Sequence, residues 1–144
     1  MKRSFETTRH IDATPQATWE VISDVARWPE WTPTIRSVDR LGDGPFQVGS
    51  RVRIRQPRLP RAEWVVTEIV PGRSFTWEAK GPGMRTTARH EVDADPAGST
   101  VTLSIEQSGP MGAVAAIVWR RLTQRYIEVE AESLAHRVTD VPTA

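Results

Sequence analysis

The sequence contains no cysteine and no long apolar run. The missing cysteine excludes disulfides, thiolate catalysis and cysteine-ligated zinc, and it suits a reducing compartment, so we expect a cytoplasmic protein. No stretch approaches the ~20 apolar residues of a membrane helix. The charged opening "MKRSFETTRHID" has no apolar segment of the signal-peptide kind. We therefore expect no stable membrane insertion.

The sequence also has no excess of charge of one sign, because 19 basic and 18 acidic side chains give a net charge of +1. This balance gives no general case for binding nucleic acid. Arg51, Arg53 and Arg55 share one face of a predicted strand, but no aromatic residue interleaves them as in single-strand binders. We interpret this arginine row as a solvated outer face and expect no nucleic-acid partner.

Residue clusters of the kind that hold metals or cofactors are absent from the pattern as well. The three histidines, His10, His90 and His136, fall on different predicted elements, and no His/Asp/Glu set has metal-ligand spacing. No glycine-rich loop opens a helix, and no Ser/His/Asp set has a defensible geometry. The sequence predicts neither a metal nor a cofactor.

Tryptophan is abundant, with six residues beside one tyrosine and three phenylalanines in a chain of 144. This length is typical of a single domain, which we assign to 1–138, with a frayed tail over 139–144. Six large rings suggest an aromatic cavity or interface. Two of them, Trp28 and Trp31, stand in the stiff segment "RWPEWTP".

Alternation of apolar and polar residues predicts strands over 4–11, 35–41, 51–57, 62–70, 73–79, 85–92 and 100–107. Thr14 and Pro15 predict the start of a helix after the first strand, and Pro29 predicts its end by Trp28. Gly/Pro turns between the strands indicate an antiparallel sheet with one wet face.

The segment 111–138 has helical periodicity and is the only element long enough to cover the sheet. Its apolar stripe comprises Met111, Val114, Val118, Leu122, Tyr126 and Val129. We expect this stripe to pack on the concave face, so that Val118→Asp would bury a charge and unfold the domain. The small residues of "GAVAA" predict unfilled volume between helix and sheet, in the ligand range of roughly 300–1,000 Å³.

Four stretches resemble a known family: "DATPQATWEVISDVARWPEWTPTI", "VTEIVPGRSFTW", "ARHEVDADPAGSTVTLSIEQSGP" and the closing helix. In this order they resemble the SRPBCC superfamily of START and birch-pollen-allergen-like proteins, in its bacterial polyketide cyclase/dehydrase and lipid transport branch. The resemblance implies an α+β helix-grip fold. In this fold a curved antiparallel sheet of about seven strands wraps around a long C-terminal helix, and short helices follow the first strand. An apolar cavity lies between the sheet and the C-terminal helix. The resemblance implies no single chemistry.

His90 is the candidate for proton transfer, because alternation places it on the inward face with Ala88 and Val92. In an aliphatic wall its pKa should fall below the usual value. A satisfied core histidine is the alternative. For the tryptophan pair, a core plug, a cavity mouth and a docking patch stay open, with Trp31 favoured as the ring nearer the ligand.

The candidate ligand-binding residues share a predicted inward or cavity-mouth position. They are Trp28, Trp31, Ile54, Gln56, Trp64, Trp77, His90, Leu103, Ile105, Gln107, Val114, Val118 and Tyr126.

Three functions follow from this pattern. The first is binding of a small hydrophobic ligand, such as a lipid, polyketide or isoprenoid, by a monomer or homodimer acting as carrier, sensor or store. The second is a cyclase/dehydratase-like enzyme in which His90, alone or together with Tyr126, transfers protons. The third is a protein–protein interaction module.

Overall fold

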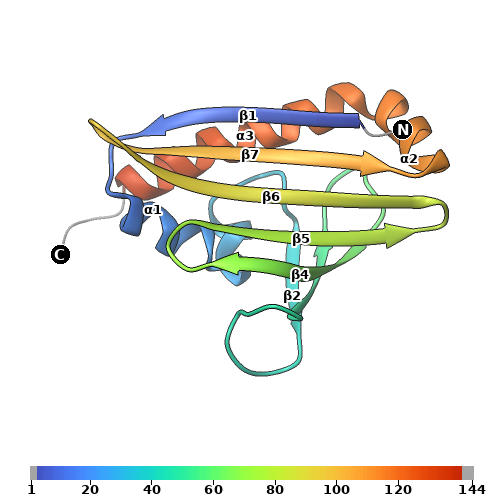
Figure 1. The fold of residues 1–144 in the computed structure, drawn as a ribbon, viewed down its shortest axis with the longest axis horizontal. Helices are drawn as coiled ribbons and strands as arrows, with labels where there is room; N and C mark the ends of the chain where they lie inside the picture. The colour runs from blue at the N-terminus through green and yellow to red at the C-terminus, as the bar shows by residue number, and fades with distance from the viewer. Residues whose placement is uncertain (1–2, 141–144) are drawn as a thin grey trace.

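A computed structural model describes residues 3–140 of the chain. Seven strands form one antiparallel sheet in the order β1-β7-β6-β5-β4-β3-β2 (Figure 1). Their bounds are β1 Arg3–Ile11, β2 Ser37–Leu41, β3 Arg51–Arg55, β4 Ala62–Val70, β5 Ser74–Gly81, β6 Met84–Asp95 and β7 Gly98–Ser108. The predicted α+β helix-grip architecture is confirmed, with a strand near every position that the alternation indicated.

Two short helical segments follow β1. In α1 (Pro15–Ile22) the Thr14 side chain accepts a hydrogen bond from the backbone N–H of Ala17 at 3.1 Å, so the predicted cap is present. The predicted end at Trp28 is slightly early, because a 3-10 helix, η1 (Val25–Glu30), carries Pro29 inside it. This segment packs beside β2 and brings Trp28 to the end of the core.

The C-terminal helix is two helices rather than the single rod predicted over 111–138. α2 (Pro110–Val118) ends at Trp119, whose φ of −106° and ψ of 20° leave the helical range, and α3 (Arg120–Asp140) follows directly. Backbone hydrogen bonds from Trp119 to Ala115 and from Thr123 to Trp119 link the two. α3 then runs behind the sheet and packs on β1 and β7 (Figure 1).

The predicted stripe of this element is wrong in its first half. Val114 is 49% exposed and Val118 is 66% exposed, so neither packs on the sheet. Later in the stripe, Leu122, Tyr126 and Val129 are only partly buried. The residues that the two helices do bury are Gly112, Ala115, Ala116, Ile127, Ala131, Leu134, Ala135 and Val138.

The reason for this error lies in α2, where both faces are apolar. The small face with Gly112 lets the helix lie close on β7, since a Cβ placed on Gly112 would meet the Gln107 backbone carbon at 3.5 Å. Periodicity alone could not choose between a small and a large apolar face. The same offset of about one residue continues in α3, where Ile127 is buried and the predicted Tyr126 is only partly buried.

The predicted tail over 139–144 also begins too early. α3 continues through Asp140, and the Thr139 hydroxyl donates a hydrogen bond to the Ala135 carbonyl at 2.8 Å. The remainder of that tail, 141–144, lies outside the described residues. No helix within residues 3–140 combines the length and the apolar character that crossing a bilayer requires.

Candidate functional site

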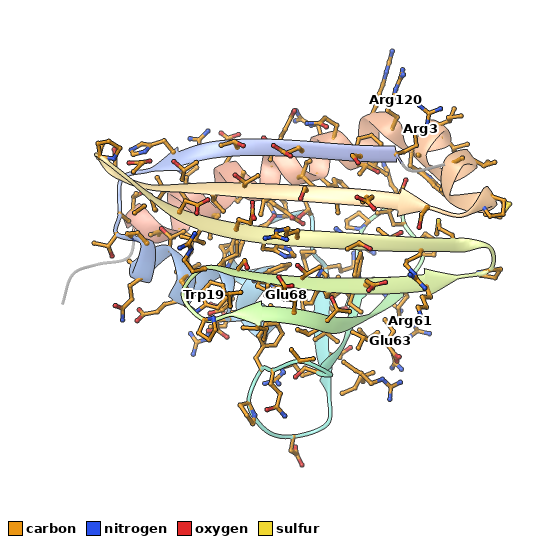
Figure 2. The ribbon with its side chains drawn as sticks, viewed as in Figure 1. Arg3, Trp19, Arg61, Glu63, Glu68 and Arg120 are labelled. Atoms are coloured by element: carbon orange, nitrogen blue, oxygen red, sulfur yellow. The ribbon has the colours of Figure 1, made fainter. Side chains whose placement is uncertain are left out.

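A cavity of about 810 Å³ lies between the inner face of the sheet and the two C-terminal helices. Its volume falls within the range usual for small-molecule sites. Strands β3 to β7, η1, α2 and α3 all contribute to its walls. Buried residues such as Trp28, Ala88 and His90 form the floor, and exposed residues such as Pro60, Arg61 and Pro82 form the mouth. Figure 2 shows Arg61 at the end of the molecule where β4 begins.

The floor is an aromatic cluster. Trp28 is 3% exposed, and its ring centroid lies 5.3 Å from that of Trp77 and 5.5 Å from that of His90. The Trp28 indole N–H donates to the Ile22 carbonyl at 3.1 Å, which satisfies its one polar atom. Trp28 is therefore both a core plug and a cavity wall.

His90 is held in one orientation by β5. Its ring stacks on Phe75 at 4.1 Å between centroids, and its Nδ1 lies 3.3 Å from the Phe75 carbonyl oxygen. Burial lowers the pKa of His90 to about 4, as the sequence predicts, and the hydrogen bond to Phe75 offsets only part of that effect. The imidazole is thus neutral at pH 7.

The tautomer of His90 follows from its partner. A carbonyl oxygen only accepts, so Nδ1 carries the proton and Nε2 is an acceptor. Nε2 has no hydrogen-bond partner among the described residues, and the side chain lines the cavity. The floor therefore offers a bound molecule one neutral nitrogen acceptor.

Glu130 is the second perturbed group of the cavity. This side chain of α3 lines the wall, and burial raises its pKa to about 7, against the effect of a hydrogen bond that the Thr34 hydroxyl donates at 3.1 Å. Thr34 is itself buried and shares a hydrogen bond with Thr32 at 2.8 Å. Near neutral pH, Glu130 is therefore divided between acid and carboxylate.

Sequence reasoning missed Glu130, although a signal was present. Glu130 is three residues after Ile127 and four before Leu134, so it falls inside the stripe that α3 buries. An acidic residue within an apolar stripe points to a functional or paired carboxyl. The misplaced stripe concealed it.

Two further polar side chains line the cavity. Gln107 is buried, and its Oε1 has no hydrogen-bond partner among the described residues. The Tyr126 hydroxyl donates to the carbonyl of Pro57, which ties α3 to the loop after β3. That bond occupies the Tyr126 proton, and the sequence-based pairing of Tyr126 with His90 in proton transfer loses support.

Most of the predicted residues come together at this cavity. Those that line it are Trp28, Ile54, Gln56, Trp64, Trp77, His90, Ile105, Gln107 and Tyr126. In β4, where both faces carry apolar residues, the buried residues Trp64 and Val66 mark the inward face, and a register shift between Val66 and Glu68 changes the alternation further along.

Four predicted residues lie elsewhere. Leu103 is buried in the core, and Val114 and Val118 face outward. Trp31 packs edge-on against Trp28 at 6.0 Å and is not in the cavity wall, so the expectation that Trp31 is the ligand-side ring is wrong. With Trp28 buried and Trp31 partly buried, an aromatic docking patch on "RWPEWTP" loses its support.

The sequence reasoning also overlooked wall residues from the helices and the loops at the mouth. They include Leu59, Met84, Ala115, Thr123 and Ile127, while Trp119, at the break between α2 and α3, also belongs to the wall.

Outside the cavity, His10 is exposed, and its environment shifts the pKa in the opposite direction from that of His90. Its two ring nitrogens lie 2.7 Å from carboxylate oxygens of Asp95 and Asp12, and hydrogen bonds to them raise its pKa. Within residues 3–140, no three His, Asp or Glu side chains gather as metal ligands would.

This combination of sheet, crossing helix and internal cavity has relatives. The sequence profile described as polyketide cyclase/dehydrase and lipid transport matches residues 2–139. The chain belongs to this family. Among proteins of curated function, none matches its sequence.

Solved structures share the fold of this chain at low sequence identity. The ZhuI aromatase/cyclase from Streptomyces sp. R1128 is 16% identical with a TM-score of 0.78, over 96% of this chain and 94% of that one. Norcoclaurine synthase from Thalictrum flavum, with dopamine and hydroxybenzaldehyde, is 14% identical with a TM-score of 0.77, over 100% and 90%. Ara h 8.0201 is 12% identical with a TM-score of 0.75, over 98% and 100%. Such identities show a shared fold and leave the chemistry to the site.

Proposed function

We propose that this protein binds a small, mainly apolar molecule inside the cavity, as a carrier, sensor or store. The observation that supports this most is the cavity of about 810 Å³ itself, with aromatic and aliphatic walls and only a few deep polar groups. Apolar walls supply the affinity, and a few placed polar atoms fix orientation. A lipid, a polyketide or an isoprenoid fits this description.

The polar groups of the cavity restrict the chemical class of the ligand further. His90 presents an acceptor at the floor, and Glu130 presents a carboxyl that either donates or accepts near neutral pH. A ligand with a hydroxyl or phenol at its buried end would satisfy the His90 nitrogen. A ligand that carried only carbonyls there would leave that nitrogen unpaired, which costs affinity.

The test combines native mass spectrometry of the purified protein with binding of anilinonaphthalene sulfonate, a probe whose emission rises in apolar sites. Ala88→Phe places a ring in the cavity, because Ala88 is buried and lines its floor. Ala94→Phe is the matched control, since Ala94 lies on the same strand, β6, and is exposed. We expect Ala88→Phe to weaken probe binding at least about tenfold and Ala94→Phe to leave it unchanged. Equal binding by the two variants would contradict the proposal.

A second candidate function is a cyclase/dehydratase-like enzyme. The observation that favours it is that two groups with displaced pKa values, His90 and Glu130, line one cavity. Such pairs are typical of acid–base sites. In this scheme Glu130 moves the proton near neutral pH, and neutral His90 accepts a hydrogen bond from the substrate.

The two functions respond differently to Glu130→Gln, which keeps the shape and removes the titration. For a binder, ligand affinity should change by no more than about 0.5–1.5 kcal/mol. For an enzyme, turnover of a synthetic poly-carbonyl thioester should fall by roughly 10²–10⁴-fold while binding survives. Mass spectrometry that detects loss of water from the thioester distinguishes them.

A further inference from the structure

Four large apolar side chains form an exposed face on α2, which we name the apolar ridge. They are Met111 at 51% exposure, Val114 at 49%, Ile117 at 66% and Val118 at 66%. Their spacing of three and four residues places them on one side of the helix. Only two other large apolar residues in the described chain are so exposed, Val48 and Val70, and neither lies in a helix.

The ridge is held outward by the fold. On the opposite side of α2, Gly112, Ala115 and Ala116 are buried. The Met111 backbone N–H donates to the Gly83 carbonyl at 3.0 Å, which anchors α2 to the turn between β5 and β6. A side chain at Gly109, whose φ is +89°, would collide with that turn, so glycine is required for this close approach. α2 therefore cannot turn its large residues inward without losing these contacts.

Positive charge adjoins the ridge. A surface hollow of about 490 Å³ at the start of α3 is lined by Phe5, Arg120, Arg121, Gln124, Arg125 and Glu128. None of the three arginines forms an ion pair with a described residue. Figure 2 shows Arg120 and Arg3 at the same end of the molecule.

The three arginines outnumber the one carboxylate of the hollow, Glu128, so the hollow carries a net positive charge. Arg121 and Arg125 are four residues apart on one helix, so their like charges repel each other. An anion seated between them would relieve this repulsion. The hollow and the ridge thus lie side by side, one suited to an anionic group and the other to apolar chains.

We propose that the apolar ridge and the arginine hollow dock the protein on an anionic lipid surface. A helix with an exposed apolar face and neighbouring arginines has the character of an interfacial helix, with apolar side chains among the acyl chains and arginines on the phosphates. A second copy of the chain is a poorer occupant, because a symmetric pairing across this face would bring two identical sets of arginines together.

The docking surface also adjoins the cavity. Ala115 and Trp119 line the cavity wall from the same helix end, and Pro82 at the mouth is next to the turn that holds Met111. Docking would therefore place α2, one wall of the cavity, against the lipid, so that an apolar ligand would have a short path from the lipid to the mouth. This last step rests on the proposed ligand binding, whereas docking itself does not.

The test is flotation with vesicles of phosphatidylcholine alone and of phosphatidylcholine mixed equally with phosphatidylglycerol. We expect the protein to float with the mixed vesicles only. The double variant Ile117→Ser/Val118→Ser should reduce its apparent affinity at least about tenfold, because two exposed apolar side chains leave the acyl region. The matched control is Val48→Ser, which changes an apolar side chain of similar exposure, 59%, far along the chain in the β2–β3 loop.

The contribution of charge is tested separately with the double variant Arg121→Gln/Arg125→Gln. Its control is Arg36→Gln/Arg55→Gln, which changes two exposed arginines near β2 and β3. The first pair should abolish the preference for phosphatidylglycerol, and the second should not. Added salt should weaken wild-type docking. Circular dichroism melts of all variants establish that each is folded.

Three outcomes would overturn the proposal: no flotation with mixed vesicles, unchanged flotation of Ile117→Ser/Val118→Ser, or equal effects of the two arginine pairs. Self-association that the ridge variant abolishes, without flotation, would instead identify a second copy as the occupant. Probe binding in the cavity, measured on the same variants, should stay unchanged. Failure of docking is thereby distinguished from failure of the proposed ligand binding.

Discussion

α2 and α3 are consecutive helices of the C-terminal segment, yet they turn opposite kinds of residue toward the sheet. α3 buries Leu134 and Ile127, at 1% and 4% exposure, whereas α2 buries glycine and alanine and exposes Ile117 and Val118. The small inward face of α2 leaves space, and Ala115 borders the cavity there. α3 therefore stabilises the fold, while α2 closes one side of the cavity and presents a surface.

The comparison is tested most strongly by truncating a large apolar residue on each helix. Leu134→Ala in α3 should lower the free energy of unfolding by about 2–5 kcal/mol, because it leaves a void in a packed core. Ile117→Ala in α2 should change it by less than about 0.5 kcal/mol, because the side chain is already in water. Urea denaturation of both variants measures the difference. Similar losses would mean that α2 is packed as tightly as α3.

The second test concerns the partly buried carboxyl of Glu130, to which α2 has no counterpart. Glu130 has its pKa raised from 4.5 to about 7, so the unfolded chain loses its proton first, and stability falls as pH rises through this window. His90 has its pKa lowered from 6.5 to about 4, so stability rises with pH between these values. In the wild type, the pH dependence of stability due to Glu130 therefore opposes that due to His90 over most of the range between pH 4 and 7.

Single variants should separate the two slopes. Glu130→Gln should leave stability rising between pH 4 and 6.5, and His90→Gln should leave it falling between pH 4.5 and 7, each by at most about 3 kcal/mol. Denaturant melts across the pH series measure both, with His136→Gln as the control, because His136 is exposed on α3 and is not part of the cavity wall. Parallel pH profiles for wild type and Glu130→Gln would show that Glu130 is not buried in the manner described.

A smaller effect is expected at the inner face of α2. Gly112→Ala adds a methyl group at ordinary contact distance, 3.5 Å from the Gln107 backbone carbon, and replaces a poor helix former. Stability should rise by about 0.5–1 kcal/mol. A thermal melt measures this, and a lower melting temperature would mean that α2 lies closer to β7 than the contact distance implies.

The smallest effect should come from Val118→Asp. Because Val118 is 66% exposed, the new carboxylate remains hydrated, and stability should change by less than about 0.5 kcal/mol. The same variant should reduce flotation with anionic vesicles. Cooperative unfolding near the wild-type midpoint supports the outward position of Val118, whereas an unfolded variant would restore the stripe predicted from periodicity.

The sequence by itself determined the strands, the cap at Thr14 and the inward position of His90. These follow from local rules, since side chains alternate across a strand and a hydroxyl before Pro15 caps a helix wherever the chain folds. It also predicted the cavity, because small residues in "GAVAA" cannot fill the space between a helix and a sheet. Fold and cavity walls were therefore largely predictable.

Only the tertiary structure decided which face of α2 turns inward, which of Trp28 and Trp31 borders the cavity, and that Glu130 is a partly buried acid with a raised pKa. α2 is apolar on both faces, so the choice depends on the distance to β7 and on the contact between Met111 and Gly83. The pKa of Glu130 depends on desolvation and on Thr34, which is 96 residues away in the chain. Such properties arise from packing between distant segments, and no local pattern of residues records them.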